Sequence, residues 1–95
     1  MDIKLIADLR YLRAYYGWID EDASDVMQSI KENPDAARYY IILSAAHRAG
    51  YEQTAENNFI RLQIWCGDKG LPDPFGPAFD VAALDALAIE TRRAT

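Results

Sequence analysis

Residues that break helices divide this chain into short segments, and this division is the strongest constraint on its fold. Gly17, the pair Asn33-Pro34 and Gly50 each interrupt the chain, and glycines and prolines recur from Gly67 to Phe79. Between these breaks the apolar residues repeat at helical spacing, and no segment has a convincing strand pattern. The sequence therefore predicts an all-α fold. We expect a single compact domain, residues 1–95, of about five short helices with a Pro/Gly-rich loop before the last helix.

The first expected helix covers Ile3 to Tyr16. Four large side chains recur on one face of it: Leu5, Leu9, Leu12 and Tyr16. Lys4 and Asp8 are expected on another side, as a charged pair four residues apart. The second expected helix begins in the acidic run Asp20-Glu21-Asp22, where carboxylates complement the helix dipole, and it ends near Glu32.

The third expected helix follows the clearest local signal in the sequence. Asn33 is expected to cap it, because an asparagine side chain accepts a hydrogen bond from the free backbone N–H groups at a helix start. Pro34 suits the first helical position. The helix is expected to end at about Arg48 or Ala49, and its residues are apolar almost all round. It should therefore be the most buried element, with Leu43 in the core.

Thr54 is expected to cap a fourth helix that runs to about Cys66. One apolar stripe on this helix contains four residues: Ala55, Phe59, Leu62 and Cys66. Ile60 and Ile64 form a second stripe. Two stripes indicate either a helix packed between neighbours or one that leaves a stripe for a partner.

The segment from Gly67 to Phe79 is expected to be irregular, because its prolines and glycines stop both helix and central strand. Three apolar residues are expected to hold it against the core: Leu71, Phe75 and Phe79. Asp80 is expected to cap a last helix, and the residues from Thr91 onward are expected to fray.

Composition restricts the class of protein. Hydrophobic residues make up 51% of the chain, which is enough for a real core and argues against disorder. No run of about 18 apolar residues occurs, so we expect no membrane span. Charged residues interrupt the N-terminal segment, so we expect no secretory signal. The single cysteine, Cys66, fits a cytoplasmic protein.

The net charge of −5 comes from 15 acidic and 10 basic residues. This balance argues against electrostatic binding to nucleic acid or to anionic lipid. The basic residues are scattered along the chain. We therefore expect no useful affinity for duplex DNA at physiological salt.

Candidate groups for catalysis or metal binding are few. His47 is the only histidine, and one histidine with one cysteine does not make a metal site. We expect His47 to be a hydrogen-bonded structural residue and Cys66 to be inert packing, with a Cys–His nucleophilic pair as a remote alternative. No phosphate-binding glycine loop or other catalytic motif occurs. The expectation is that the protein is not an enzyme and has no catalytic, metal or cofactor-binding residue.

Residues 45–62 have the spacing of a helix-turn-helix, with Ala46 in the first helix and Gly50 in the turn. Five side chains would then lie in or just before the second helix and read base edges: Gln53, Thr54, Asn57, Asn58 and Arg61. This segment resembles the helix-turn-helix unit of small phage-type repressors and excisionases, although Glu56 or Ala55 stands where that unit has an inward apolar residue. The resemblance implies, as an alternative function, a DNA-binding regulator.

The leading functional hypothesis is a small acidic protein-protein interaction module. Its partner surface is expected to use aromatic residues beside the main stripe of the first helix, Tyr11 and Tyr15, and the carboxylates at the start of the second: Asp20, Glu21, Asp22 and Asp25. The expected partner is a protein with a basic surface, and a homodimer is a further expectation. By analogy of size and charge, the module is of the phage or mobile-element type that inhibits nucleic-acid-binding machines.

Overall fold

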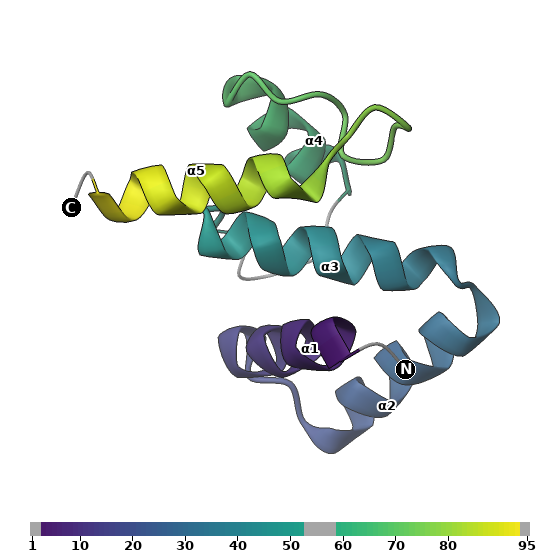
Figure 1. The fold of residues 1–95 in the computed structure, drawn as a ribbon. Helices are drawn as coiled ribbons and strands as arrows, with labels where there is room; N and C mark the ends of the chain where they lie inside the picture. The colour runs from purple at the N-terminus through teal and green to yellow at the C-terminus, as the bar shows by residue number, and fades with distance from the viewer. Residues whose placement is uncertain (1–2, 53–58, 94–95) are drawn as a thin grey trace. The chain divides into compact units, whose positions relative to one another are not determined.

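The computed structural model describes residues 3–52 and 59–93. Its helices are α1 (Ile3–Tyr16), α2 (Asp20–Glu32), α3 (Asp35–Arg48), α4 (Phe59–Asp68) and α5 (Val81–Arg93), as Figure 1 shows. The described residues contain no strand, and residues 69–80 form an irregular loop before α5. The predicted all-α fold is confirmed. Within the same residues, no helix is both long and apolar enough to cross a membrane.

The chain divides into two compact units, Met1–Ser44 and Ala45–Thr95. The division falls inside α3, so the first unit contains α1, α2 and most of α3. The second unit contains the end of α3 together with α4, the loop and α5. The expectation of a single domain over residues 1–95 stays a prediction.

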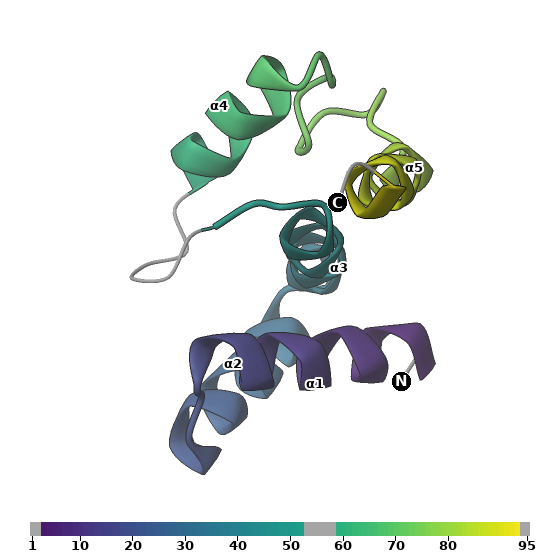
Figure 2. The same cartoon turned by 90° about the vertical axis from the view of Figure 1, so that its left-hand side faces the viewer.

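The first helix ends where the sequence predicted. Gly17 adopts a φ of +67°, which glycine accepts without the strain that a side chain would cause. The N–H of Trp18 then donates to the carbonyl oxygen of Arg13 at 3.0 Å and closes the end of α1. Gly50, with a φ of +109°, follows α3 in a comparable way. Figure 2 shows the short connection by which α1 leads into α2.

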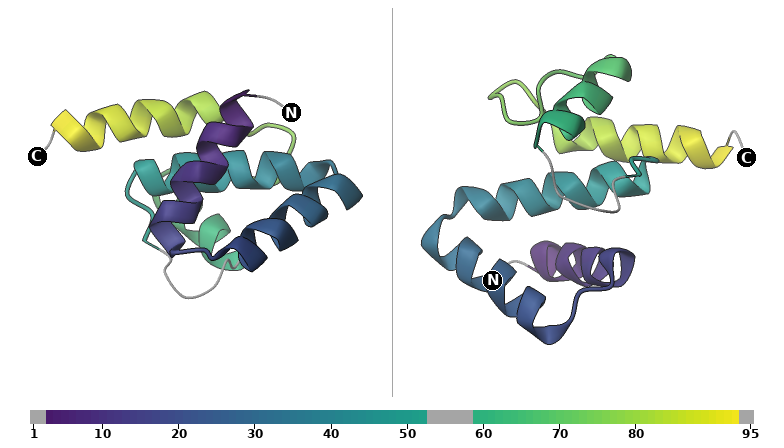
Figure 3. Two further views of the ribbon diagram at one scale, coloured as in Figure 1. Left: turned by 90° about the horizontal axis from the view of Figure 1, so that it is seen from below. Right: turned by 180° about the vertical axis from the view of Figure 1, so that it is seen from behind.

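The cap of α3 is also confirmed. The side-chain oxygen of Asn33 accepts a hydrogen bond from the N–H of Asp35 at 3.1 Å. Pro34 fixes the backbone between them, and the chain changes direction sharply from α2 into α3 (Figure 3). Both ends of α3 agree with the helix expected from the sequence.

Asn33→Ala is expected to lower the free energy of unfolding by about 0.5–2 kcal/mol, because the N–H of Asp35 loses its acceptor. Asn33→Asp is the matched control, since aspartate keeps an acceptor oxygen and suits a helix start. Urea titration followed by circular dichroism measures both. Equal losses for the two variants would contradict the cap.

α3 contains the longest buried run among the described residues. Positions 42–47 are all buried, and Leu43 is 1% exposed. The prediction that this helix is the most buried element, with Leu43 in the core, is therefore confirmed. The segment 39–43, rich in residues that favour strands, is helical throughout.

The interior face of α1 differs from the predicted stripe. Its buried residues are Leu5, Asp8 and Leu12. Leu9 and Tyr16 are only half-buried. The placement of Asp8 on a separate, charged side was wrong, since its side chain is 2% exposed.

In the second unit, α4 buries Leu62 and Cys66, and α5 buries Leu84 and Ala88. Two predicted helix ends were too early. α4 continues through the helical Gly67 to Asp68, and α5 continues to Arg93. The Asp80 cap is confirmed, because its side chain accepts a hydrogen bond from the N–H of Ala82 at 3.0 Å.

The loop of residues 69–80 is held differently from the prediction. Phe79 is buried and Leu71 is half-buried, but Phe75 is 39% exposed, and Pro74 is buried beside it. The Asp73 carboxylate accepts hydrogen bonds from the N–H of Phe75 at 3.0 Å and from Gln63 at 3.1 Å. These two bonds hold the pKa of Asp73 below its ordinary value, and the bond from the backbone of Phe75 has the larger effect. The carboxylate thus fixes the turn that directs Pro74, rather than Phe75, inward.

Candidate protein-interaction surface

Six aromatic rings of the first unit contact one another in series. Tyr11 stacks on Tyr15 with ring centroids 6.3 Å apart and planes at 25°. The contacts continue from Tyr15 along four more rings: Tyr16, Trp18, Tyr40 and Tyr39. Tyr11 is half-buried and Tyr15 is 37% exposed. The two tyrosines singled out from the sequence therefore lie at one end of this series, and their role in binding stays a prediction.

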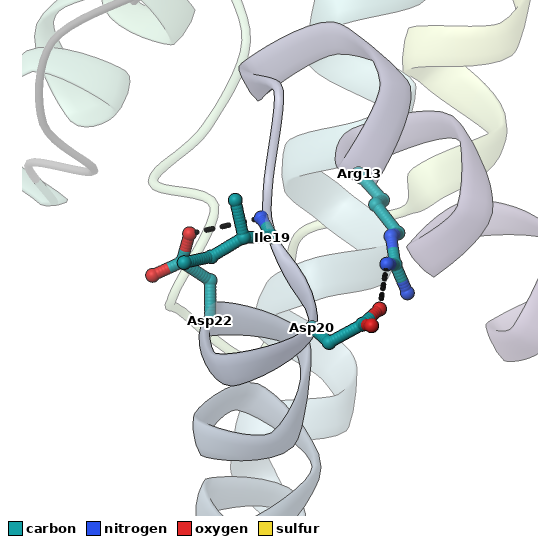
Figure 4. A network of polar contacts seen from close by, with 4 residues as sticks. All are labelled: Arg13, Ile19, Asp20 and Asp22. Carbon is teal, nitrogen blue, oxygen red and sulfur yellow. Dashed lines mark hydrogen bonds and ion pairs between the residues drawn. The ribbon is translucent and has the colours of Figure 1, made fainter.

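Two of the four predicted carboxylates have local structural roles (Figure 4). Asp20 forms an ion pair with Arg13 of α1. Asp22 accepts a hydrogen bond from the backbone N–H of Ile19 at 3.1 Å. The ion pair joins the start of α2 to α1, and the hydrogen bond closes the first turn of α2. The ion pair is exposed, so it contributes little to stability and acts mainly on geometry.

The other two carboxylates face away from the unit. α2 has no fully buried residue, and its half-buried side chains lie on one face: Ala23, Val26, Met27 and Ile30. Glu21 and Asp25 lie on the opposite, exposed face, and Glu32 continues the same line. We call Glu21, Asp25 and Glu32 the acidic stripe. Glu32 was missed from the sequence, although its spacing of seven residues from Asp25 indicates the shared face.

The charge of the chain is concentrated on α2. Its 13 residues include five carboxylates and one lysine, which gives a net charge of −4 for the helix against −5 for the whole chain. The remaining ten acidic and nine basic residues nearly cancel. Most of the net negative charge of the chain is therefore carried by one helix.

A groove of about 370 Å³ lies between α1 and α2. Most of its lining is apolar: Ile6, Leu9, Trp18, Ala23, Val26 and Met27. Arg10 and Arg13 of α1 complete it. We call it the α1/α2 groove. Sequence reasoning did not find it, because a groove depends on how closely two helices approach and not on the pattern of either one.

The residues of the helix-turn-helix alternative lie mostly outside the described residues. Gln53, Thr54, Asn57 and Asn58 all fall in the segment 53–58, and so does the expected Thr54 cap. Arg61 is described and is exposed on α4. The described part of the chain therefore adds no observation that favours DNA binding.

His47 is the structural residue that the sequence predicted. It is 6% exposed, and its Nδ1 lies 2.6 Å from the backbone oxygen of Tyr51. A carbonyl oxygen only accepts, so Nδ1 carries the proton and donates it. Burial lowers the pKa of His47 below its ordinary value, and the hydrogen bond to Tyr51 opposes this effect in part.

This lowered pKa makes stability depend on pH. Below about pH 6.5 the unfolded chain binds a proton at His47 that the folded protein excludes. The free energy of unfolding is expected to be highest above about pH 6.5, to fall as the pH falls through that value, and to level off below the folded pKa. Denaturant titrations between about pH 5 and pH 8 measure it. His47→Gln is expected to remove this step, and an unchanged profile in the variant would contradict the assignment.

Cys66 is buried in α4 and has no accessible surface. Burial, together with the Asp73 carboxylate, raises the pKa of its thiol to about 11. The sulfur is therefore protonated at neutral pH and is not a nucleophile. Its predicted role as packing is confirmed, and the Cys–His alternative gains no support.

The chemically unusual pair in the first unit is one that the sequence did not reveal. The Ser44 hydroxyl of α3 donates to the Asp8 carboxyl oxygen of α1 at 3.0 Å, and both side chains are buried. The two residues are 36 positions apart, so no local pattern connects them. The bond lies in the interior and joins two helices, which identifies it as a packing contact and not as part of a surface.

Over residues 3–52 and 59–93, no group of three His, Cys, Asp or Glu side chains is placed to hold a metal ion. Comparison of the chain with protein-family models, with curated proteins and with solved structures finds no match.

Proposed function

We propose that this protein is a non-enzymatic interaction module that binds a protein with a basic surface through the acidic stripe of α2. The observation that carries the proposal is the localisation of charge: α2 has a net charge of −4 in a chain of −5. Complementary potential of this kind accelerates encounter and fixes orientation. The basic partner that we favour is a nucleic-acid-binding protein, whose binding site the stripe would cover and so inhibit.

The residues of α2 differ in what they contact, and this difference supports the proposal. Asp20 and Asp22 fix the start of the helix, and the apolar face attaches it to the unit. Glu21 and Asp25 do neither, and both are exposed. A partner can therefore contact the stripe without disturbing the contacts that hold α2 in place.

A photo-crosslinking amino acid at position 25 tests the proposal, with the same group at the exposed Asp85 of α5 as a control. Cells of the natural source are irradiated, and proteins attached to position 25 are identified by mass spectrometry. We expect a basic nucleic-acid-binding protein at position 25 and not at position 85. Recovery of the same proteins at both positions would overturn the proposal.

The purified partner then allows a charge test. Glu21→Gln with Asp25→Asn is expected to weaken binding by roughly five- to thirtyfold at about 150 mM salt, from about 0.5–1 kcal/mol per exposed charge pair. Asp85→Asn with Glu90→Gln removes the same charge from exposed positions of α5 and is expected to have little effect. Equal weakening by both pairs would mean that net charge, and not the stripe, governs binding.

A further inference from the structure

The second unit exposes an apolar ridge on α4. Ile60 and Ile64 are 64% and 59% exposed, and they lie one turn apart on the face opposite the buried Leu62 and Cys66. Of the two apolar stripes predicted for this helix, Leu62 and Cys66 of the first are buried, whereas Phe59 of the first and both isoleucines of the second are exposed. Two large aliphatic side chains that are exposed one turn apart form an apolar patch that a partner can cover.

The first unit offers the complementary shape. The α1/α2 groove is concave and mainly apolar, and its volume of about 370 Å³ admits side chains that project from one face of a helix. Ile6, at its edge, is 37% exposed. The grooves of two copies cannot fill each other, because both are concave. A second copy that binds in this groove must therefore present a convex apolar surface, and the α4 ridge is such a surface.

Charges on the two surfaces are also complementary. Arg10 and Arg13 line the groove, and Arg13 is paired with Asp20. Within residues 3–52 and 59–93, Arg10 is the groove cation for which no ion pair is seen. On α4, Asp68 follows Ile64 by four residues and lies near it on the same exposed side. A helix that places Ile64 in the groove therefore carries a carboxylate one turn further along, toward an arginine.

We propose that the Ile60–Ile64 ridge of one copy of this chain binds in the α1/α2 groove of a second copy, with Asp68 of the first directed to Arg10 of the second. The contact is heterologous, because each copy contributes a different surface. It leaves the acidic stripe of α2 uncovered, since the stripe lies on the opposite face of that helix from the groove-lining Val26 and Met27.

Sedimentation velocity between about 1 and about 500 μM protein at about 150 mM salt is the first measurement. We expect the mass of the native chain to rise with concentration. Ile64→Glu, in the ridge, and Ile6→Glu with Arg10→Glu, in the groove, are each expected to weaken self-association at least tenfold. Ile89→Glu is the matched control, because Ile89 is 51% exposed on α5, and it is expected to associate like the native chain.

Mixing the two weakened variants separates this contact from a symmetric one. The Ile64→Glu chain keeps an intact groove, and the Ile6→Glu, Arg10→Glu chain keeps an intact ridge. An equimolar mixture is therefore expected to form a one-to-one complex although each variant alone stays monomeric. In the same way, Arg10→Asp combined with Asp68→Arg in one chain is expected to restore association that either change alone weakens.

A native chain that stays monomeric over the whole range would overturn this proposal, and so would a mixture that contains only monomers. Circular dichroism verifies that each variant is folded, and Ile64→Ser replaces Ile64→Glu if the glutamate prevents folding. The Ile64→Glu chain also retains the acidic stripe. Crosslinking of a partner to position 25 of the Ile64→Glu chain therefore tests the proposed function in a protein that does not self-associate.

Discussion

Leu43→Ala is expected to lower the free energy of unfolding by about 2–5 kcal/mol, which is a large part of the stability of a chain of this size. Leu43 is 1% exposed in the buried run of α3. Its truncation removes apolar contacts and leaves a cavity that the neighbouring helices fill only in part. Urea titration followed by circular dichroism measures the change.

The control for this substitution is Ile89→Ala, which removes a similar amount of aliphatic side chain from a position that is 51% exposed. Its effect is expected to stay within about 0.5 kcal/mol. A loss below about 1 kcal/mol at Leu43 would mean that this residue is not in a packed core, and it would contradict the burial of α3.

Ser44→Ala is expected to lower the free energy of unfolding by about 1–3 kcal/mol, although alanine fits the space and favours a helix more than serine does. The substitution removes the hydroxyl that donates to the buried Asp8 carboxyl group at 3.0 Å. Water does not reach this position to replace the donor, since Ser44 is 0% and Asp8 is 2% exposed.

Ser24→Ala on α2 is the matched control, because Ser24 is exposed and changes only helix propensity. Alanine is expected to be neutral or slightly stabilising there. The difference between the two substitutions therefore isolates the Ser44–Asp8 bond. If Ser44→Ala were as harmless as Ser24→Ala, the bond would contribute nothing to stability.

The helix boundaries were largely predictable because they depend on neighbouring residues. Gly17 adopts the positive φ that ends α1, and Asn33 caps α3 with its own side chain. These interactions span only a few positions, so the residues that make them are visible in the sequence. Two helix ends were predicted wrongly. Gly67 was expected to lie beyond α4 but is helical, and the residues from Thr91 were expected to fray although α5 continues to Arg93.

The candidate surface was predictable only in part. The sequence indicated acidic residues at the start of α2, but Asp20 and Asp22 differ from Glu21 and Asp25 in what they contact. The approach of α1 decides in part which carboxylates can contact a partner, because Arg13 of that helix pairs with Asp20. The acidic stripe therefore required both the helical period and the position of the neighbouring helix.

The sequence by itself determined that this chain forms helices, where most of them begin and end, and that Leu43 is in the core. Those properties follow from backbone preferences and from apolar periodicity, both of which act over a few residues. Only the tertiary structure decided that Asp8 is buried, that Phe75 is exposed and that Ile60 and Ile64 have no interior position. Each of these outcomes depends on contacts between segments distant in the chain. The burial of Asp8, for example, is offset by the hydroxyl that Ser44 donates from another helix.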